Sequence, residues 1–328
     1  MTCMDRERLT TLIESSDLNG LVRFVDGLVA SRDWDGVALM RDLCREAVDR
    51  GKQVWGAAEF AEYRLALDAP ASYVLDVVRP GAGRYGNGPL WEVAASTHSW
   101  EELSAIQDPA LRVLVAHERM LRGDTLEGVS VDQTVVDAPL KLALWEPDYP
   151  VAEYRSDRAN FPELAVGGLR WVDLPEPIEP LKTSTVGDAL LDLVRPWIDE
   201  SSGRGDAVAV EGSAEAAIRA LGPHRVRLVD IDLKTATGVM CWAGASGGAY
   251  GRRRGSPVGR ALAWWTLAIV LGMDEQWPVD GDELGVEAAG LRWVLWDPGD
   301  QTAGWAFHLA IEDPVDGLAW AVSAVDAR

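Results

Sequence analysis

Two stretches near the end of the chain, RVRLVDIDLKTATGVMCWAGAS (225–246) and LRWVLWDPGDQTAGWAFHLAIED (291–313), share one order of features. Each begins with an alternating apolar segment, passes through a polar turn that ends in glycine, and returns in a second apolar segment. Each is followed by an N-cap residue and proline, in SPVGRALAWW (256–265) and DPVDGLAWAV (313–322). The pattern predicts two strand–strand–helix (ββα) units that form an antiparallel sheet with helices on one face. The alternative is chance similarity among common strand and helix starts.

The C-terminal part of the chain, residues 184–328, is therefore predicted to be an α+β domain. A strand over DAVAVEG (206–212) extends the sheet, and apolar periodicity predicts a helix before it at 185–199. The two units supply strands at 225–232, 238–244, 291–297 and 304–313. Helices are expected at 213–222, 256–272, 282–290 and from Pro314 onward.

Residues 1–124 are predicted to form an irregular domain of helical hairpins. Apolar residues in segment 18–29 recur with the i, i+3, i+4, i+7 spacing of one helix face. Further helices are expected at 37–48, 54–67, 90–106 and 109–122. Short turns between helices of this length favour stacked antiparallel pairs. Residues 125–183 are rich in proline, as in DLPEPIEPLKTS (173–184), and are predicted to connect the two domains.

The composition limits the classes of partner. The chain has 328 residues, 48% of them hydrophobic and 25% charged, which is typical of a globular protein. Its 15 tryptophans are expected to be core anchors or interface residues. A net charge of −21 repels a phosphate backbone, so general nucleic-acid binding is not expected and a protein partner fits better.

The cysteines and the apolar segments predict a cytoplasmic location. Cys3, Cys44 and Cys241 are odd in number and lack metal-ligand spacing, which indicates reduced thiols and no metal site. The longest uncharged apolar segment, 261–273, is too short to span a bilayer, so no membrane association is expected. The first residues, MTCMDRERL, carry charges where a signal peptide needs an apolar run.

A basic island lies within this acidic chain. Residues 233–273 contain no aspartate or glutamate, and the glycine- and arginine-rich segment GGAYGRRRG (247–255) lies near their centre. Glycines that lead into the N-terminus of a helix can present backbone N–H groups to an anion, and arginines add bidentate contacts. The predicted ligand-binding residues are Gly247, Gly248, Tyr250, Gly251, Arg252, Arg253, Arg254, Ser256 and Arg260.

A structural interpretation of the same segment competes with the anion site. A buried strand and a buried helix would lack acidic residues anyway, and the arginines can pair with carboxylates of a neighbouring domain. Only four of the 31 basic residues are lysines, so an arginine cluster is less informative here than in an average protein.

A second candidate site combines Gly212 and Ser213 with the carboxylates of Asp230 and Asp232. A Gly-Ser at a helix start followed by Asp-x-Asp on a strand resembles the nucleotidyltransferase pattern, which implies a phosphate site and a Mg²⁺ ion held by the two carboxylates. The spacing from Ser213 to Asp230 is longer than that pattern has, and Asp297 is the one plausible third carboxylate. The alternative is a serine N-cap and acidic residues at a strand end.

Two segments resemble a known group of sequences. GGAYGRRRG with the following GRALAWW (259–265), and AAEFAEYRLAL (57–67), are similar to uncharacterised proteins common in actinobacteria, over most of the chain. That family has no known activity, so the resemblance implies no function.

Three functions follow from these features. The first is a cytoplasmic, non-catalytic binding or regulatory protein without a cofactor, whose segment 247–260 contacts an anionic ligand or partner. The second is a Mg²⁺-dependent enzyme that acts on a nucleotide or phosphorylated substrate, with Asp230 and Asp232 as weak candidates for its catalytic residues. The third is an acidic protein that neutralises a basic toxin or enzyme.

Overall fold

The computed structural model describes residues 3–81, 83, 88–132, 134–299 and 304–327. The chain divides into two compact units. The helical unit consists of Met1–Val135 and Ala152–Phe161, and the sheet unit of Val136–Val151 and Pro162–Arg328. No helix among the described residues is long and apolar enough to cross a membrane.

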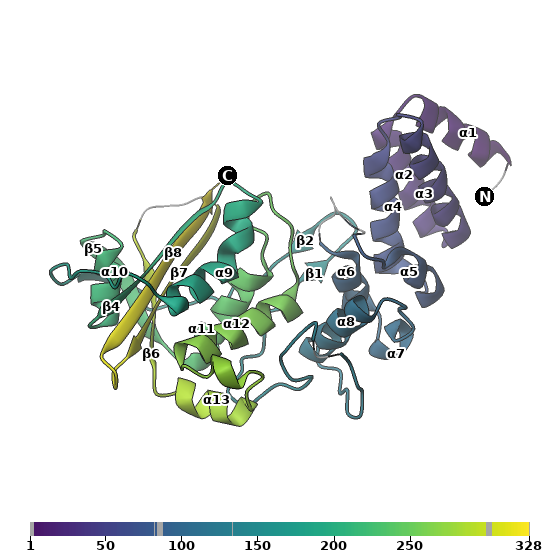
Figure 1. Ribbon diagram of the computed structural model, residues 1–328. Coiled ribbons are helices and arrows are strands. Elements are labelled where there is room, and N and C mark those ends of the chain that lie inside the picture. Colours follow the sequence, from purple (N-terminus) through teal and green to yellow (C-terminus); the bar gives the residue numbers. More distant parts are fainter. Residues whose placement is uncertain (1–2, 82, 84–87, 133, 300–303, 328) are drawn as a thin grey trace. The chain divides into compact units, whose positions relative to one another are not determined.

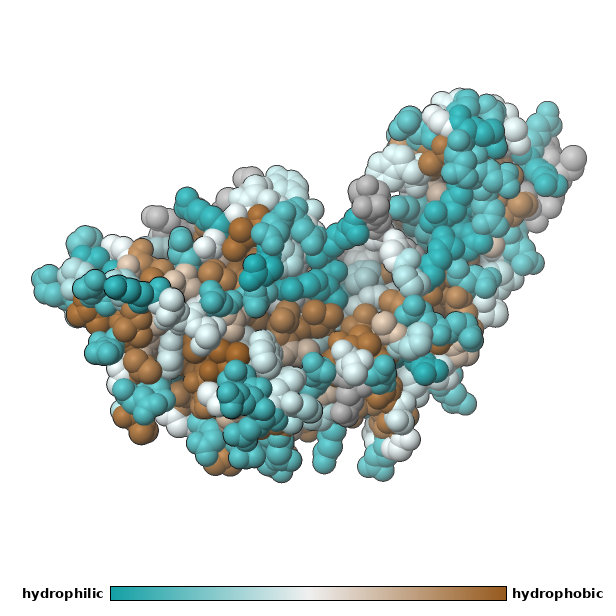
Figure 2. All heavy atoms as spheres, in the orientation of Figure 1, coloured by the Kyte–Doolittle hydropathy of each residue, from teal (hydrophilic) through white to brown (hydrophobic). Residues whose placement is uncertain are grey.

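The helical unit is a stack of short helices with one small hairpin (Figure 1). Its helices are α1 (Cys3–Glu14), α2 (Leu18–Ala30), α3 (Trp34–Asp49), α4 (Trp55–Asp68), α5 (Ala71–Val77), α6 (Leu90–Thr97), α7 (Trp100–Leu103) and α8 (Pro109–Leu121). Strands β1 (Glu153–Tyr154) and β2 (Ala159–Asn160) form the hairpin. Aspartate side chains cap the N-termini of α2, α3 and α8, and helix α4 contacts α2, α3, α5 and α6. The helices of this unit present mainly hydrophilic residues on the face seen in Figure 2.

The sheet unit contains one six-stranded sheet in which every neighbouring pair of strands is antiparallel. Its strands are β3 (Arg170–Asp173), β4 (Arg204–Glu211), β5 (Arg225–Ile231), β6 (Arg292–Asp297), β7 (Gly304–Asp313) and β8 (Leu318–Ala327), in the spatial order β3-β5-β6-β7-β8-β4. Its helices are α9 (Thr185–Asp199), α10 (Ala214–Ala220), α11 (Leu233–Ala245), α12 (Ser256–Val270), α13 (Gly281–Ala288) and a 3₁₀ turn at Asp274–Gln276. The predicted α+β class and the antiparallel sheet are confirmed.

The strand predicted at 238–244 is wrong, because this segment belongs to helix α11. Asp232 caps that helix by accepting a hydrogen bond from the Thr235 backbone N–H at 2.8 Å. Glycines bring α11 close to α12: a Cβ atom on Gly244 would lie 3.0 Å from the Cα of Gly259, and one on Gly259 would overlap the Cys241 carbonyl oxygen. Gly244 and Gly259 therefore permit close packing of the two helices.

The helix predicted from Pro314 is also wrong, because the chain turns there and returns as strand β8. The Asp313 carboxylate accepts hydrogen bonds from the backbone N–H groups of Val315 at 2.8 Å and Asp316 at 3.1 Å. Gly317 adopts a φ of +67° and closes the turn. An aspartate followed by proline starts either a helix or a turn, and here the left-handed glycine decides for the turn. The two predicted ββα units do not exist.

Helices lie on both faces of the sheet, and the prediction of helices on one face is wrong. On one face, α10 packs against apolar side chains that include Val210, Leu228 and Val294. On the other face, α9 packs against β4. A Cβ atom on Gly187 of α9 would contact Ala207 of β4, and a Cβ atom on Gly205 of β4 would contact side chains of α9. Helices α11 and α12 join α9 in this second layer (Figure 1).

Candidate functional site

The glycine- and arginine-rich segment is the connection between α11 and α12, and we call residues 247–255 the Gly/Arg loop. Because α11 is a helix, the segment is a helix–helix loop, whereas the predicted pair of units would make it an insertion between strand and helix. Loops that connect rigid elements are common places for binding residues.

Backbone hydrogen bonds hold the Gly/Arg loop in one conformation. The Ala249 N–H donates to Asp326 Oδ2 at 2.6 Å, and the Tyr250 N–H donates to the Ser201 hydroxyl at 3.1 Å. At the end of the loop the Arg254 N–H donates to the Ala245 carbonyl at 2.8 Å. The loop is therefore fixed to α11, to strand β8 and to the segment after α9.

The loop glycines have a structural reason within the loop. A Cβ atom on Gly247 would overlap the backbone of Arg252, and one on Gly251 would overlap the carbonyl oxygen of Gly247. Gly248 has a φ of +73°, and a Cβ atom there would overlap the Asp326 carboxylate. These three glycines allow the loop to fold back on itself.

Arg260 is completely buried, so its side chain has no surface for a ligand. Its guanidinium donates to the two Glu146 carboxylate oxygens at 2.6 and 2.7 Å and to the Pro139 carbonyl at 2.7 Å. Burial opposes ionisation of Glu146, but the hydrogen bonds and charge of Arg260 hold its pKa below the usual range. The predicted binding role of Arg260 is replaced by a structural one.

Arg254 is also committed internally. Its Nη2 donates to the Leu193 carbonyl at 2.7 Å and approaches the Asp192 carbonyl at 3.4 Å. Pro196 lies inside α9 and lacks the N–H that would bond to the Asp192 carbonyl, so this carbonyl is a free acceptor. Burial lowers the pKa of Arg254 to about 10, which leaves the side chain charged at neutral pH.

The side chains of Tyr250 and Arg252 remain directed to solvent. Tyr250 is 67% exposed, and Arg252, two residues further along the loop, is also exposed. Arg253 is half-buried and donates to the Ser256 hydroxyl at 3.2 Å. Ser256 itself is buried and Gly255, with a φ of +93°, occupies the N-cap position of α12. The first turn of α12 is therefore covered by the loop, and the accessible cationic part of the segment is at Arg252 and Arg253.

The two carboxylates of the nucleotidyltransferase-like pattern have separate partners. Asp230 accepts a hydrogen bond from Arg292 Nε at 2.7 Å, and the same guanidinium pairs with Glu215 at 2.7 Å and Glu312 at 2.8 Å. Asp232 caps α11, and its hydrogen bonds with Thr235 lower the pKa of its carboxyl. The structure thus gives both aspartates structural roles.

The other members of that pattern are similarly engaged. Ser213 caps α10 by accepting from the Ala216 N–H at 3.4 Å, and the Gly212 N–H donates to the Gly317 carbonyl at 2.8 Å. Asp297 pairs with Arg227. Within the described part of the chain, no group of three histidine, cysteine, aspartate or glutamate side chains could hold a metal ion.

An aromatic cluster that the sequence pattern did not predict lies under the Gly/Arg loop. The rings of Trp197 and Trp242 are 5.9 Å apart, and the ring of Trp305 lies 6.4 and 5.3 Å from them. A Cβ atom on Gly248 would lie 3.2 Å from Trp197, so the loop rests directly on this cluster. Asp326 is the register partner of Trp305 and is fully buried. The three tryptophans come from α9, α11 and β7, so no local pattern in the sequence indicated the cluster.

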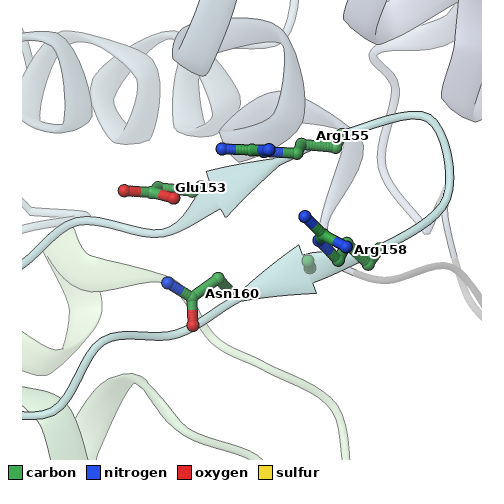
Figure 3. Close-up of a pocket in the computed structure, with 5 residues that line it drawn as sticks. Glu153, Arg155, Arg158 and Asn160 are labelled. Atoms are coloured by element: carbon green, nitrogen blue, oxygen red, sulfur yellow. The ribbon is translucent and has the colours of Figure 1, made fainter.

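A surface pocket that the sequence pattern did not predict lies on the β1–β2 hairpin, within the segment predicted to be a connector. The pocket has a volume of about 330 Å³ and is lined by Glu153, Arg155, Arg158, Ala159 and Asn160 (Figure 3). The alternating polar residues of EYRSDRAN (153–160) were the signal for this hairpin.

Comparison with known proteins gives a family whose function is unknown. A family model described only as a family of unknown function matches residues 19–320. No curated protein matches the chain, and no solved structure matches it.

Proposed function

The chain belongs to the family of unknown function DUF6183, and we propose that it is a non-catalytic binding protein that docks an acidic partner protein through the Gly/Arg loop. One observation carries the proposal: a loop fixed by hydrogen bonds at Ala249 and Tyr250 directs the Tyr250 and Arg252 side chains to solvent. Tyrosine and arginine are enriched among the residues that dominate binding energy at protein interfaces.

The arrangement favours a protein surface over a small anion as the occupant. A small anion would need several donors that converge on it. Arg254 and Arg260 donate to groups inside the sheet unit, the first turn of α12 is covered, and the Ala249 and Tyr250 N–H groups already have acceptors. The side chains that remain exposed are the Tyr250 ring and the Arg252 guanidinium, which suit contact with a complementary surface.

The charge distribution supports an acidic partner. The region without acidic residues around the loop carries a net positive charge in a chain whose total is −21. An acidic partner is repelled by most of the surface and attracted to this place, which favours one docking orientation. The proposal includes a cytoplasmic location, which the buried free thiols of Cys44 and Cys241 support.

The two other functions have weaker support. Asp230 and Asp232 are engaged by Arg292 and Thr235, so no observation favours a metal-dependent enzyme. An acidic protein that neutralises a basic toxin is supported by the excess of 52 acidic over 31 basic residues. That function predicts binding through acidic surfaces away from the Gly/Arg loop.

Affinity capture with matched variants tests the proposal. The wild-type chain, a Tyr250→Ala/Arg252→Glu variant and an Arg204→Glu control are used to capture proteins from a lysate of the native host. Arg204 is an exposed arginine at the start of β4, and Arg204→Glu changes the net charge by the same amount as Arg252→Glu. We expect an acidic protein that the wild type and the control capture and the loop variant loses. Capture of the same proteins by all three would reject the loop as the docking site, and a basic protein retained by all three would favour the neutralising function.

A further inference from the structure

The outer face of the β1–β2 hairpin carries two arginines directly opposite each other. Burial alternates along the hairpin, so Tyr154 is buried while Glu153, Arg155, Arg158 and Asn160 are exposed. Glu153 is the register partner of Asn160. The Arg155 N–H donates to the Arg158 carbonyl at 2.8 Å, which makes these two arginines the next cross-strand pair. Opposed residues of this kind have Cβ atoms about 5 Å apart.

The inner face of the hairpin is anchored to the helices of its own unit. The Tyr154 hydroxyl donates to Glu92 of α6 at 2.7 Å, and the Tyr63 hydroxyl of α4 donates to the Arg155 carbonyl at 2.5 Å. Arg122, the residue after α8, donates to the Ala152 carbonyl at 2.7 Å. Three separate contacts therefore hold the backbone that displays the two arginines, and a fixed backbone is what a specific site requires.

Carboxylates of the described residues compensate the charge of the two arginines only weakly. Like charges directly opposite on a hairpin destabilise it. In the described part of the chain, Arg155 forms no ion pair, and Arg158 has only Asp157 at 3.9 Å with both side chains mostly exposed. Glu153 lies on the same face and pairs with neither arginine. An anion between the guanidinium groups would relieve their repulsion and accept hydrogen bonds from both.

The pocket around this pair contains both signs of charge. In Figure 3 the guanidinium of Arg158 is directed toward the strand that carries Arg155, while Glu153 and Asn160 lie farther along the hairpin. Successive same-face residues on a strand are about 7 Å apart, so the two ends of one small molecule can reach side chains at both positions. A polyanion would be repelled by Glu153, whereas an amine would be attracted to it.

We propose that this pocket binds a small zwitterion, with its phosphate or carboxylate between Arg155 and Arg158, its ammonium group at Glu153, and the Asn160 amide as a further hydrogen-bonding group. The volume of about 330 Å³ accommodates a molecule of amino-acid size. This site is separate from the Gly/Arg loop and does not depend on the proposed docking function.

Isothermal titration calorimetry with simple probes tests the site. Phosphoethanolamine and β-alanine each carry an amine two carbons from a phosphate or a carboxylate group, respectively, and inorganic phosphate is the probe without an amine. We expect saturable binding of at least one of the two zwitterions, tighter than that of inorganic phosphate. The preferred zwitterion shows which oxyanion the arginines recognise.

Variants assign the binding to the hairpin. Arg155→Gln/Arg158→Gln is expected to weaken binding of the preferred zwitterion about tenfold or more, because two charge-assisted contacts are lost. Glu153→Gln is expected to remove the preference over inorganic phosphate. The control Arg6→Gln/Arg112→Gln removes two exposed arginines of the same unit and is expected to bind like the wild type.

Several results would overturn the proposal. They are the absence of saturable binding of both zwitterions, equal affinity for inorganic phosphate and the zwitterions, and unchanged binding in the Arg155→Gln/Arg158→Gln variant. All five substituted side chains are exposed, and unchanged circular dichroism spectra would show that each variant is folded.

Discussion

The carboxylate of Asp326, in the last strand of the sheet, accepts a hydrogen bond of 2.6 Å from the backbone N–H of Ala249 in the Gly/Arg loop. The two residues are 77 positions apart in the chain, and Asp326 is fully buried. The contact joins β8 to the loop above the cluster of Trp197, Trp242 and Trp305. A buried carboxylate that accepts from a backbone N–H is a strong and specific restraint, so the C-terminal strand determines the conformation of the loop.

Asp326→Ala should loosen the loop. The substitution leaves the Ala249 N–H without its acceptor, and we expect the free energy of unfolding to fall by about 1–3 kcal/mol. Hydrogen–deuterium exchange should accelerate at residues 248–250, and urea denaturation measures the stability. Asp316→Ala, at an exposed position of the β7–β8 turn, is the control and should leave both unchanged. Unchanged exchange in Asp326→Ala would show that the contact does not restrain the loop.

The arginines of the basic segment should separate into two energetic classes. Arg260→Met leaves the buried Glu146 carboxylate without its charge partner, so we expect a loss of about 3–5 kcal/mol in the free energy of unfolding. Arg252→Met changes an exposed side chain and should alter stability by less than about 0.5 kcal/mol. Urea denaturation of both variants provides the comparison. Similar losses in the two would contradict the assignment of Arg260 to structure and Arg252 to binding.

Part of this fold could be predicted from the sequence, and part depends on contacts between distant segments. Periodicity and capping signals predicted α9 and α12 correctly. They failed at 238–244, where the apolar run around Val239 suggested a strand but packing of Gly244 against Gly259 stabilises a helix. Local signals do not contain such a tertiary contact.

The candidate site, like the fold, could be predicted from the sequence only in part. The absence of acidic residues from 233–273 identified the Gly/Arg loop, but the sequence did not separate its arginines. Arg254 is committed because it donates to the Leu193 carbonyl of α9, and Arg260 is committed because Glu146 lies beside it. Both partners are more than 50 positions away, so spacing within the segment cannot reveal them.

Close packing of α11 on α12 predicts opposite effects for two glycine-to-alanine substitutions. A Cβ atom on Gly259 would overlap the Cys241 carbonyl oxygen, so Gly259→Ala should destabilise the chain by about 1–3 kcal/mol. Gly27 lies within α2 with no atom within 4 Å of an added Cβ, so Gly27→Ala should stabilise by about 0.5–1 kcal/mol. Thermal and urea unfolding measure both. Stabilisation by Gly259→Ala would contradict the close approach of the two helices.

His308 predicts a loss of stability in mild acid. Its ring lies 4.6 Å from that of Trp296, and burial lowers its pKa to about 4. The unfolded chain binds a proton at this residue below a pH of about 6.5 and the folded chain does not, so its contribution is present above that pH and is lost as the pH falls. Between a pH of about 6.5 and about 4 the loss from this residue approaches 3 kcal/mol, an order-of-magnitude value.

Urea denaturation across this pH range checks the prediction. His308→Gln should reduce the pH dependence of the free energy of unfolding, because glutamine does not titrate. His224→Gln, at an exposed histidine, should retain the wild-type dependence. An identical pH dependence in His308→Gln and the wild type would show that His308 titrates alike in the folded and unfolded chain.

Photo-crosslinking in the native host tests the docking function most directly. p-Benzoylphenylalanine replaces Tyr250 in one strain and Val315, which is 90% exposed in the β7–β8 turn, in a control strain. If the Gly/Arg loop is the docking site, illumination yields one discrete adduct with an acidic protein from position 250. That adduct is absent from position 315 and disappears when Arg252→Glu is added. No adduct from position 250, or the same adducts from both positions, would contradict the assignment of the loop as the binding surface.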